Sequence, residues 1–218
     1  MTPELEIRLK HCTSLPSIPG VAIKILDLSK DPQVCPEDVS SVVTLDPALS
    51  SKMLRITNSP IYSRISKIGT VQQALTLLGV DASLNLALSF SLVSGLQQQS
   101  QDSILDYDAV WRRASISAVA CRLLGETLKS GSLEELFLAG LLQDIGVLAL
   151  DRVFPDQYSD IFSGAVDMFS ISIDEQAQIN ATHAEVGAWL LNEWDLPEKL
   201  VAAIRASHGD GSRADSDD

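Results

Sequence analysis

The sequence predicts an all-helical protein, and three helix start signals are the strongest evidence for this fold class. Thr70-Val71-Gln72-Gln73, Ser132-Leu133-Glu134-Glu135 and Thr182-His183-Ala184-Glu185 each have the form of a capping box. In this motif the first side chain accepts a hydrogen bond from the backbone amide three residues on, and the fourth side chain reaches back. Apolar residues at helical spacing follow each box, and strand signals barely appear.

Six further helices are predicted from apolar residues at helical spacing or from a proline in the first turn. Asp46-Pro47 reads as a helix cap followed by a first-turn proline, and Asn58-Ser59-Pro60 ends that helix. In chain order, the six helices carry Val21, Ile25 and Leu28; Val39, Val42 and Val43; Leu49, Met53 and Ile56; Leu84, Leu88 and Leu92; Trp111, Ala118 and Leu123; and, after Pro197, Leu200, Val201 and Ile204.

The polar stretch Gln97 to Asp102 divides the chain, because it holds three consecutive glutamines and no apolar residue. We therefore expect an N-terminal helical subdomain over residues 1–100 and a second one over residues 101–208. Residues 209–218 are small, polar and acidic, which is typical of a flexible tail or an interdomain linker. The stretch from Phe154 to Asp174 reads either as a loop or as a helix.

The charge balance excludes two classes of partner. The net charge is −13 and the pI is about 4.5. Nucleic-acid binding needs clustered lysine and arginine residues, and the longest basic pair on a predicted helix is Arg112-Arg113. Anionic membrane surfaces are disfavoured for the same reason. We therefore expect neither nucleic acid nor membrane as a partner.

The cysteines, the charged N-terminal residues and the lack of a long apolar run together indicate a cytoplasmic protein. The three cysteines are an odd number without a CxxC motif, so they predict free thiols rather than a disulfide framework or a zinc knuckle. Met1 to Lys10 carries four charged residues and no apolar core, which does not fit a signal peptide. No run approaches 18 uncharged apolar residues, so no transmembrane helix is expected.

The sequence lacks the motifs of several kinds of catalytic site. The sequence contains neither GxGxxG nor GxxxxGK[ST], which would cradle phosphates, and no GxSxG nucleophile elbow. Its only histidines are His11, His183 and His208. The most suggestive segment is Ala139-Gly140-Leu141-Leu142-Gln143-Asp144-Ile145-Gly146.

That segment resembles the G-L-L-H-D-I-G motif of HD-superfamily proteins, with Gln143 at the histidine position. From about Leu15 to His208, the chain resembles the HDOD family, a degenerate branch of that superfamily. The order and spacing of several short segments carry the resemblance: Leu15 to Pro19, Asp46 to Leu49, Asn58 to Pro60, Ala74 to Gly79, His183 to Ala188, Trp194 to Pro197 and Ala203 to His208.

The resemblance implies a fold in which an N-terminal helical bundle packs on a degenerate HD-like bundle. It also implies a non-catalytic regulatory role in bacterial signal transduction, including cyclic-di-GMP signalling. The expected partners are other proteins, or a C-terminal output domain of the GGDEF type in a longer chain. A homodimer is the default for signalling modules.

The resemblance also places the residues of a vestigial metal site. A working HD site needs His and Asp side chains that converge on divalent cations, which then activate a water. Here Arg113 matches the position of the first histidine, and a guanidinium has no lone pair to offer a cation. Gln143 offers a neutral amide, whereas Asp144, His183 and His208 remain as potential ligands.

Three protein ligands can hold a metal, but simpler roles are open to each residue. Asp144 can cap a helix or form an ion pair with Arg113 in place of a metal. His183 can be a polar surface group in the first turn of its helix, and His208 can favour a helix C-terminus. We therefore expect no catalytic residue, no metal and no other cofactor. The alternatives are a metal-dependent phosphohydrolase acting on a nucleotide or cyclic dinucleotide, and a nucleotide-binding sensor without turnover that uses Arg113.

Overall fold

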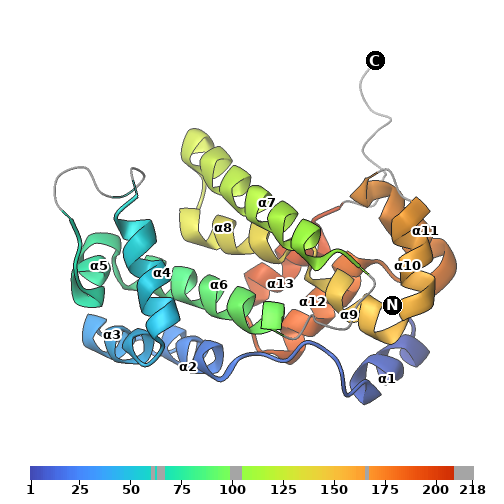
Figure 1. The fold of residues 1–218 in the computed structure, drawn as a ribbon, viewed down its shortest axis with the longest axis horizontal. Coiled ribbons are helices and arrows are strands. Elements are labelled where there is room, and N and C mark those ends of the chain that lie inside the picture. Colours follow the sequence, from blue (N-terminus) through green and yellow to red (C-terminus); the bar gives the residue numbers. More distant parts are fainter. Residues whose placement is uncertain (60–61, 63–66, 99–104, 165–166, 209–218) are drawn as a thin grey trace. The chain divides into compact units, whose positions relative to one another are not determined.

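The computed structural model describes residues 1–59, 62, 67–98, 105–164 and 167–208, and the regular structure in these ranges is helical (Figure 1). This confirms the predicted all-α class. In chain order, the helices are α1 (Pro3–His11), α2 (Gly20–Ser29), α3 (Pro36–Thr44), α4 (Pro47–Thr57), α5 (Val71–Leu78), α6 (Val80–Gln98), α7 (Tyr107–Leu128), α8 (Leu133–Leu142), α9 (Ile145–Val153), α10 (Pro155–Gly164), α11 (Met168–Ile179), α12 (His183–Glu193) and α13 (Glu198–Arg205).

The predicted capping residues begin their helices. Thr70, Ser132 and Thr182 each accept a hydrogen bond from the backbone amide three residues on, at 3.2, 3.3 and 3.2 Å. Asp46 accepts from two backbone amides at the start of α4. Each of these caps satisfies donors that a helix N-terminus would otherwise leave unpaired.

Two predicted loop stretches contain helix. Gln97 and Gln98, which begin the expected linker, are the last two residues of α6, since glutamine is a good helix former despite its polarity. Residues 99–102 of that linker and the expected tail 209–218 lie outside the described residues. The stretch from Phe154 to Asp174 contains α10 and most of α11, so its interpretation as a loop is wrong. Asp167 forms a capping box at the start of α11, which the sequence pattern did not reveal.

Helix packing groups the chain into two compact units that do not follow chain order. One unit comprises the described parts of 1–16, 100–120 and 139–218, and the other comprises those of 17–99 and 121–138. The short helix α1 belongs with the first group, where it contacts α9, and its Leu5 and Leu9 are buried. The expected division into subdomains of residues 1–100 and 101–208 stays a prediction.

In the unit of residues 17–99 and 121–138, α6 forms the centre and contacts α2, α3, α4 and α5. Its buried face includes two serines, Ser83 and Ser89, whose hydroxyls donate to backbone carbonyls one turn back. These internal bonds let polar side chains lie in an apolar core. Among the described residues, no helix combines the length and apolar character needed to cross a membrane.

In the other unit, α9 is the most buried helix, and its packing on α12 positions the candidate site. All residues from Ile145 to Asp151 are buried. A Cβ atom added to Gly146 would lie 1.9 Å from the carbonyl oxygen of His183 and 2.6 Å from the backbone nitrogen of Gly187. The two backbones therefore touch, which brings Asp144, just before α9, next to the start of α12.

Replacing Gly146 by alanine should separate α9 from α12, because its Cβ would overlap backbone atoms that cannot move aside. We expect Gly146→Ala to lower the free energy of unfolding by about 1–3 kcal/mol, the cost of overpacking a core. Each kcal/mol corresponds to a fall of roughly 2–4 °C in Tm for a chain of this size. Gly20→Ala is the control, since an added Cβ there meets nothing within 4 Å. An unchanged Tm in Gly146→Ala would contradict the close approach.

Candidate functional site

The carboxylate of Asp144 is the centre of the candidate site. Asp144 stands at the N-terminus of α9, is 3% exposed, and makes no side-chain hydrogen bond to the helix backbone. Its two oxygens face different neighbours. Oδ2 meets side chains from α7 and from the adjacent Gln143, while Oδ1 meets the two histidines.

Arg113 and Gln143 donate toward Oδ2. The Nε and Nη2 atoms of Arg113 lie 3.1 and 2.7 Å from this oxygen. Gln143 directs Nε2 to the hydroxyl of Ser117 at 2.9 Å, and the same nitrogen is 3.4 Å from Oδ2. An ionised carboxylate only accepts hydrogen bonds, which fixes the NH2 group of Gln143 on this side. Both residues therefore present N–H donors where metal ligands would present lone pairs.

The histidines lie on the side of Oδ1. Nε2 of His208, just beyond α13, is 2.9 Å from Oδ1 and carries the proton of that hydrogen bond. Nε2 of His183 is 3.6 Å from Oδ1, in ion-pair range but beyond hydrogen-bond range, and it has no hydrogen-bond partner. The two rings meet edge to face, with centroids 4.5 Å apart.

Glu175 and Tyr158 complete a buried network that the sequence analysis missed. Glu175, on α11, receives the backbone N–H and the Nδ1–H of His183, each at 2.7 Å, while the hydroxyl of Tyr158 donates to its other oxygen. All three residues are fully buried. A sequence signal existed: Glu175 lies four residues after Ile171 and four before Ile179, so an acid interrupts the apolar face of a helix.

The environment shifts three of these pKa values. Burial opposes ionisation of Asp144, but interactions with His183, His208 and the Arg113 charge outweigh it and hold the pKa of Asp144 well below its usual value. Burial likewise opposes protonation of His183, yet Asp144 and Glu175 raise the pKa of His183 to about 9. Burial and the nearby Glu175 raise the pKa of Tyr158. Near neutral pH, the ionised Asp144 therefore lies between two cations, the protonated His183 and the Arg113 guanidinium.

The structure brings together all five residues named from the sequence: Arg113, Gln143, Asp144, His183 and His208. The proposed ion pair between Arg113 and Asp144 is present, whereas the alternative role of Asp144 as a side-chain helix cap is not observed. The interpretation of His183 as a surface group is wrong, because the side chain is fully buried at the α9–α12 contact. A capping box marks where a helix begins and carries no information about burial.

The residues fit a two-metal centre poorly. Arg113 and Gln143 cannot ligate through the N–H groups that they direct at Oδ2. On the other side, single ligand atoms of Asp144, His183 and His208 lie within 4.8 Å of one another, which is compatible with one cation. That cation would have to displace protons from both imidazoles, and His183 holds its proton tightly.

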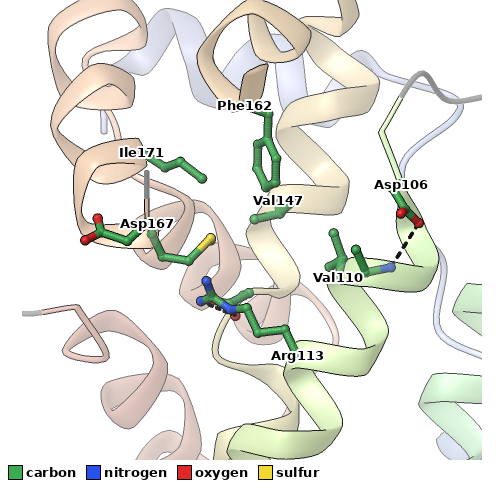
Figure 2. A pocket seen from close by; sticks show the side chains of 10 residues that line it. Asp106, Val110, Arg113, Val147, Phe162, Asp167 and Ile171 are labelled. Carbon is green, nitrogen blue, oxygen red and sulfur yellow. Dashed lines mark hydrogen bonds and ion pairs between the residues drawn. The ribbon is translucent and has the colours of Figure 1, made fainter. Parts of the chain in front are cut away.

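A cavity of about 270 Å³ adjoins the Arg113–Asp144 pair (Figure 2). Its wall is largely apolar, with Val110, Val147, Phe162 and Ile171 around the space and the Arg113 side chain along one side. The volume is just below the roughly 300–1,000 Å³ typical of small-molecule pockets. It therefore suits a small ligand better than one as large as a cyclic dinucleotide.

Comparison with known proteins gives a family match and a curated relative. The sequence model of the HDOD domain family matches residues 15–209. An uncharacterised protein of Treponema pallidum (strain Nichols) is 22% identical over 196 residues, which cover 89% of this chain and 37% of that protein.

Solved structures share the fold. An HDOD domain protein of unknown function from Geobacter sulfurreducens has a TM-score of 0.74 at 22% identity, with 97% of this chain and 72% of that chain covered. A Shewanella amazonensis SB2B protein provisionally assigned as a phosphohydrolase has a TM-score of 0.72 at 26% identity, with 91% and 70% covered. A Marinobacter aquaeolei VT8 protein provisionally assigned to signal transduction has a TM-score of 0.66 at 26% identity, with 93% and 48% covered. The chain thus spans less than half of the Treponema and Marinobacter proteins.

The raised pKa of His183 predicts a loss of stability in mild alkali. A group whose pKa is higher in the folded state stabilises the fold fully below its unfolded value of 6.5, and this contribution is lost as the pH rises through about 9. Urea unfolding from pH 6 to pH 10 should therefore show a falling free energy of unfolding. In His183→Gln this decline should be flatter. Equal slopes in the two proteins would contradict a cationic His183.

Removing the charge of Asp144 should destabilise the fold strongly. Asp144→Asn leaves Arg113 and the buried His183 without their shared anion, and breaking a buried ion pair in this way typically costs about 3–5 kcal/mol. The exposed Asp108, in the first turn of α7, provides a matched control: Asp108→Asn should change stability by less than about 0.5 kcal/mol. Similar melting curves for the two variants would show that the network contributes little.

Proposed function

This chain belongs to the HDOD domain family, and we propose that it is a non-catalytic regulatory module of signal transduction. It would act by contact with another protein or with a small ligand. The observation that carries the proposal is the position of Arg113, whose guanidinium lies 2.7 Å from the Asp144 carboxylate. A fixed positive charge there supplies the electrostatic role of a cation without its Lewis acidity.

The same network supports a role in structure rather than in turnover. Hydrolysis of a phosphate ester by a metal enzyme needs an activated water beside the cation. Arg113 and Gln143 both present N–H donors to Asp144, and neither can act as a base that activates water. Glu175 is buried and receives three donors from Tyr158 and His183, so it is engaged in holding the imidazole.

The small apolar cavity beside Arg113 favours ligand sensing over binding of a large nucleotide. A compact molecule with an apolar body would contact Phe162 and Val147. Because Arg113 borders both the cavity and Asp144, a bound molecule could influence the ion pair directly. Transmission of the signal to an output domain in a longer chain is part of this proposal.

A second candidate is a metal-dependent phosphohydrolase, and one observation favours it. Nε2 of His183 is buried without a hydrogen-bond partner, and its Nδ1 is oriented by Glu175 as in many metal-binding histidines. Asp144, His183 and His208 would hold a single cation, which would make a bound water more acidic. The fixed charge of Arg113 opposes this binding.

Metal content after loading decides between the two candidates. The purified chain is incubated with manganese or iron, desalted and assayed for metal. We expect far less than one ion per chain, and no hydrolysis of an activated phosphodiester or a cyclic dinucleotide. A gain-of-ligand variant, Arg113→His with Gln143→His, should retain more metal than the wild type, because both N–H donors become imidazoles.

Retention of about one ion per wild-type chain, lost in His208→Ala, would overturn the proposal in favour of the phosphohydrolase. His208→Ala is a suitable probe because, among the described residues, its side chain makes one hydrogen bond, to Asp144 at the edge of the network. Thermal unfolding of each variant verifies that lost metal does not reflect a lost fold.

A further inference from the structure

The Arg113 guanidinium has hydrogen-bonding capacity that its ion pair leaves unused. Its Nε and Nη2 atoms both donate to Oδ2 of Asp144, whereas Nη1 makes no hydrogen bond to the described residues. A guanidinium is a donor on all three nitrogens, so the N–H groups of Nη1 are left for an acceptor from outside this part of the chain. The Arg113 side chain is 35% exposed and lines the 270 Å³ cavity, whose lining residues all belong to one compact unit. A ligand in this cavity can therefore supply the missing acceptor.

The remaining wall of the cavity favours a hydrocarbon group. Val147 and Ile171 are buried, and Phe162 and Met168 are half-buried around the same space. Figure 2 shows Phe162 and Ile171 toward one end of this space and Arg113 toward the other. At about 30 Å³ for each water-sized group, the volume has room for roughly nine such groups. A fitting ligand thus has a short apolar body and a single polar end.

The charges around the cavity decide which polar end fits. The described residues that line it include three aspartates, Asp106, Asp144 and Asp167, and one cationic residue, Arg113. Asp106 and Asp167 cap the starts of α7 and α11 and stand on opposite sides of the cavity in Figure 2. Their charges disfavour an anion, while the charge of Arg113 disfavours a cation at its free donors. An uncharged acceptor such as a carbonyl oxygen avoids both repulsions.

We propose that the cavity binds an uncharged carbonyl compound with a short apolar chain, such as an amide, an ester or a lactone. The carbonyl oxygen accepts a hydrogen bond from Nη1 of Arg113, and the chain lies against Phe162 and Val147. Phe162 also packs on Tyr158, with ring centroids 5.6 Å apart, and Tyr158 donates to Glu175. The ligand therefore contacts the buried network directly at Arg113 and indirectly through Phe162. This inference rests on the ligand-sensing role proposed above and specifies the class of ligand.

A series of three ligands with the same hydrocarbon chain and different polar ends tests the ligand class. Hexanamide, hexanoate and hexylamine are each titrated into the nitrogen-15-labelled chain near neutral pH, in the presence of a chelator, and followed by NMR. We expect hexanamide to bind with a Kd of about 1 mM or lower and to shift the Nε–H signal of Arg113. Hexanoate and hexylamine should bind about tenfold more weakly or worse, because each meets a like charge.

Two variants and a control locate the binding site. Val110→Phe adds a ring to the cavity wall, leaves the ionic network unaltered, and should weaken hexanamide binding by about tenfold or more. Val119→Phe is the matched control, because it makes the same substitution at an exposed position of α7 and should leave the Kd unchanged. Arg113→Lys keeps a positive charge beside Asp144 but lacks Nη1, so it should also raise the Kd by about tenfold. Thermal unfolding verifies that each variant is folded.

Tighter or equal binding of hexanoate or hexylamine would overturn the proposed ligand class. So would hexanamide binding that Val110→Phe leaves unchanged, or no binding of any of the three compounds at millimolar concentration. These failures differ from a failure of the regulatory proposal, which the metal content decides. A chain that retains no metal and binds no hexanamide contradicts only the ligand class, whereas a chain that retains one ion contradicts the regulatory proposal whatever it binds.

Discussion

The ionic contacts of the Asp144 carboxylate hold the candidate site together. A carboxylate that is 3% exposed has lost nearly all its water, and an unpaired charge in that position would cost several kcal/mol. Arg113 and His208 replace the water with hydrogen bonds, and His183 adds a second positive charge. Glu175 and Tyr158 then support His183 from behind. Asp144 thus links α7, α12 and the residues after α13 directly, and His183 connects α11 to them.

The contacts of Asp144 stabilise the fold, and they also limit the reactions in which its carboxylate can take part. Arg113, Gln143 and His208 each direct an N–H donor at the carboxylate, so a metal ion at Asp144 would compete with these hydrogen bonds. Such a network is rigid, because moving one member leaves its neighbours charged and unpaired. The adjoining cavity of about 270 Å³ is, in contrast, lined mainly by apolar side chains that tolerate different contacts. Apolar side chains of the cavity wall can therefore be substituted without removing a member of the charged network.

Local features of the fold could be predicted from the sequence, and the buried network only in part. Thr70, Ser132 and Thr182 identified helix starts because a capping box involves four consecutive residues. Arg113 and Asp144 could be paired only through the resemblance to a known family, since 31 residues separate them. Glu175 belongs to a stretch without a motif, and its burial depends on contacts with Tyr158 and His183, which lie on other helices and cannot be paired with it from the helical pattern of α11 alone. The polarity of Gln97 and Gln98 suggested a linker although their helix propensity is high.

Gly146 touches the backbone of His183 and Gly187. This contact fixes the backbone of the site independently of the side chains that face Asp144. Main-chain atoms, rather than side chains, set the distance between α9 and α12. Side chains near this contact can consequently be exchanged while Asp144 and His183 remain where they are. In a frame of this kind, a substitution at the site changes the groups that face Asp144 while the backbone distance between α9 and α12 is kept by the contact at Gly146.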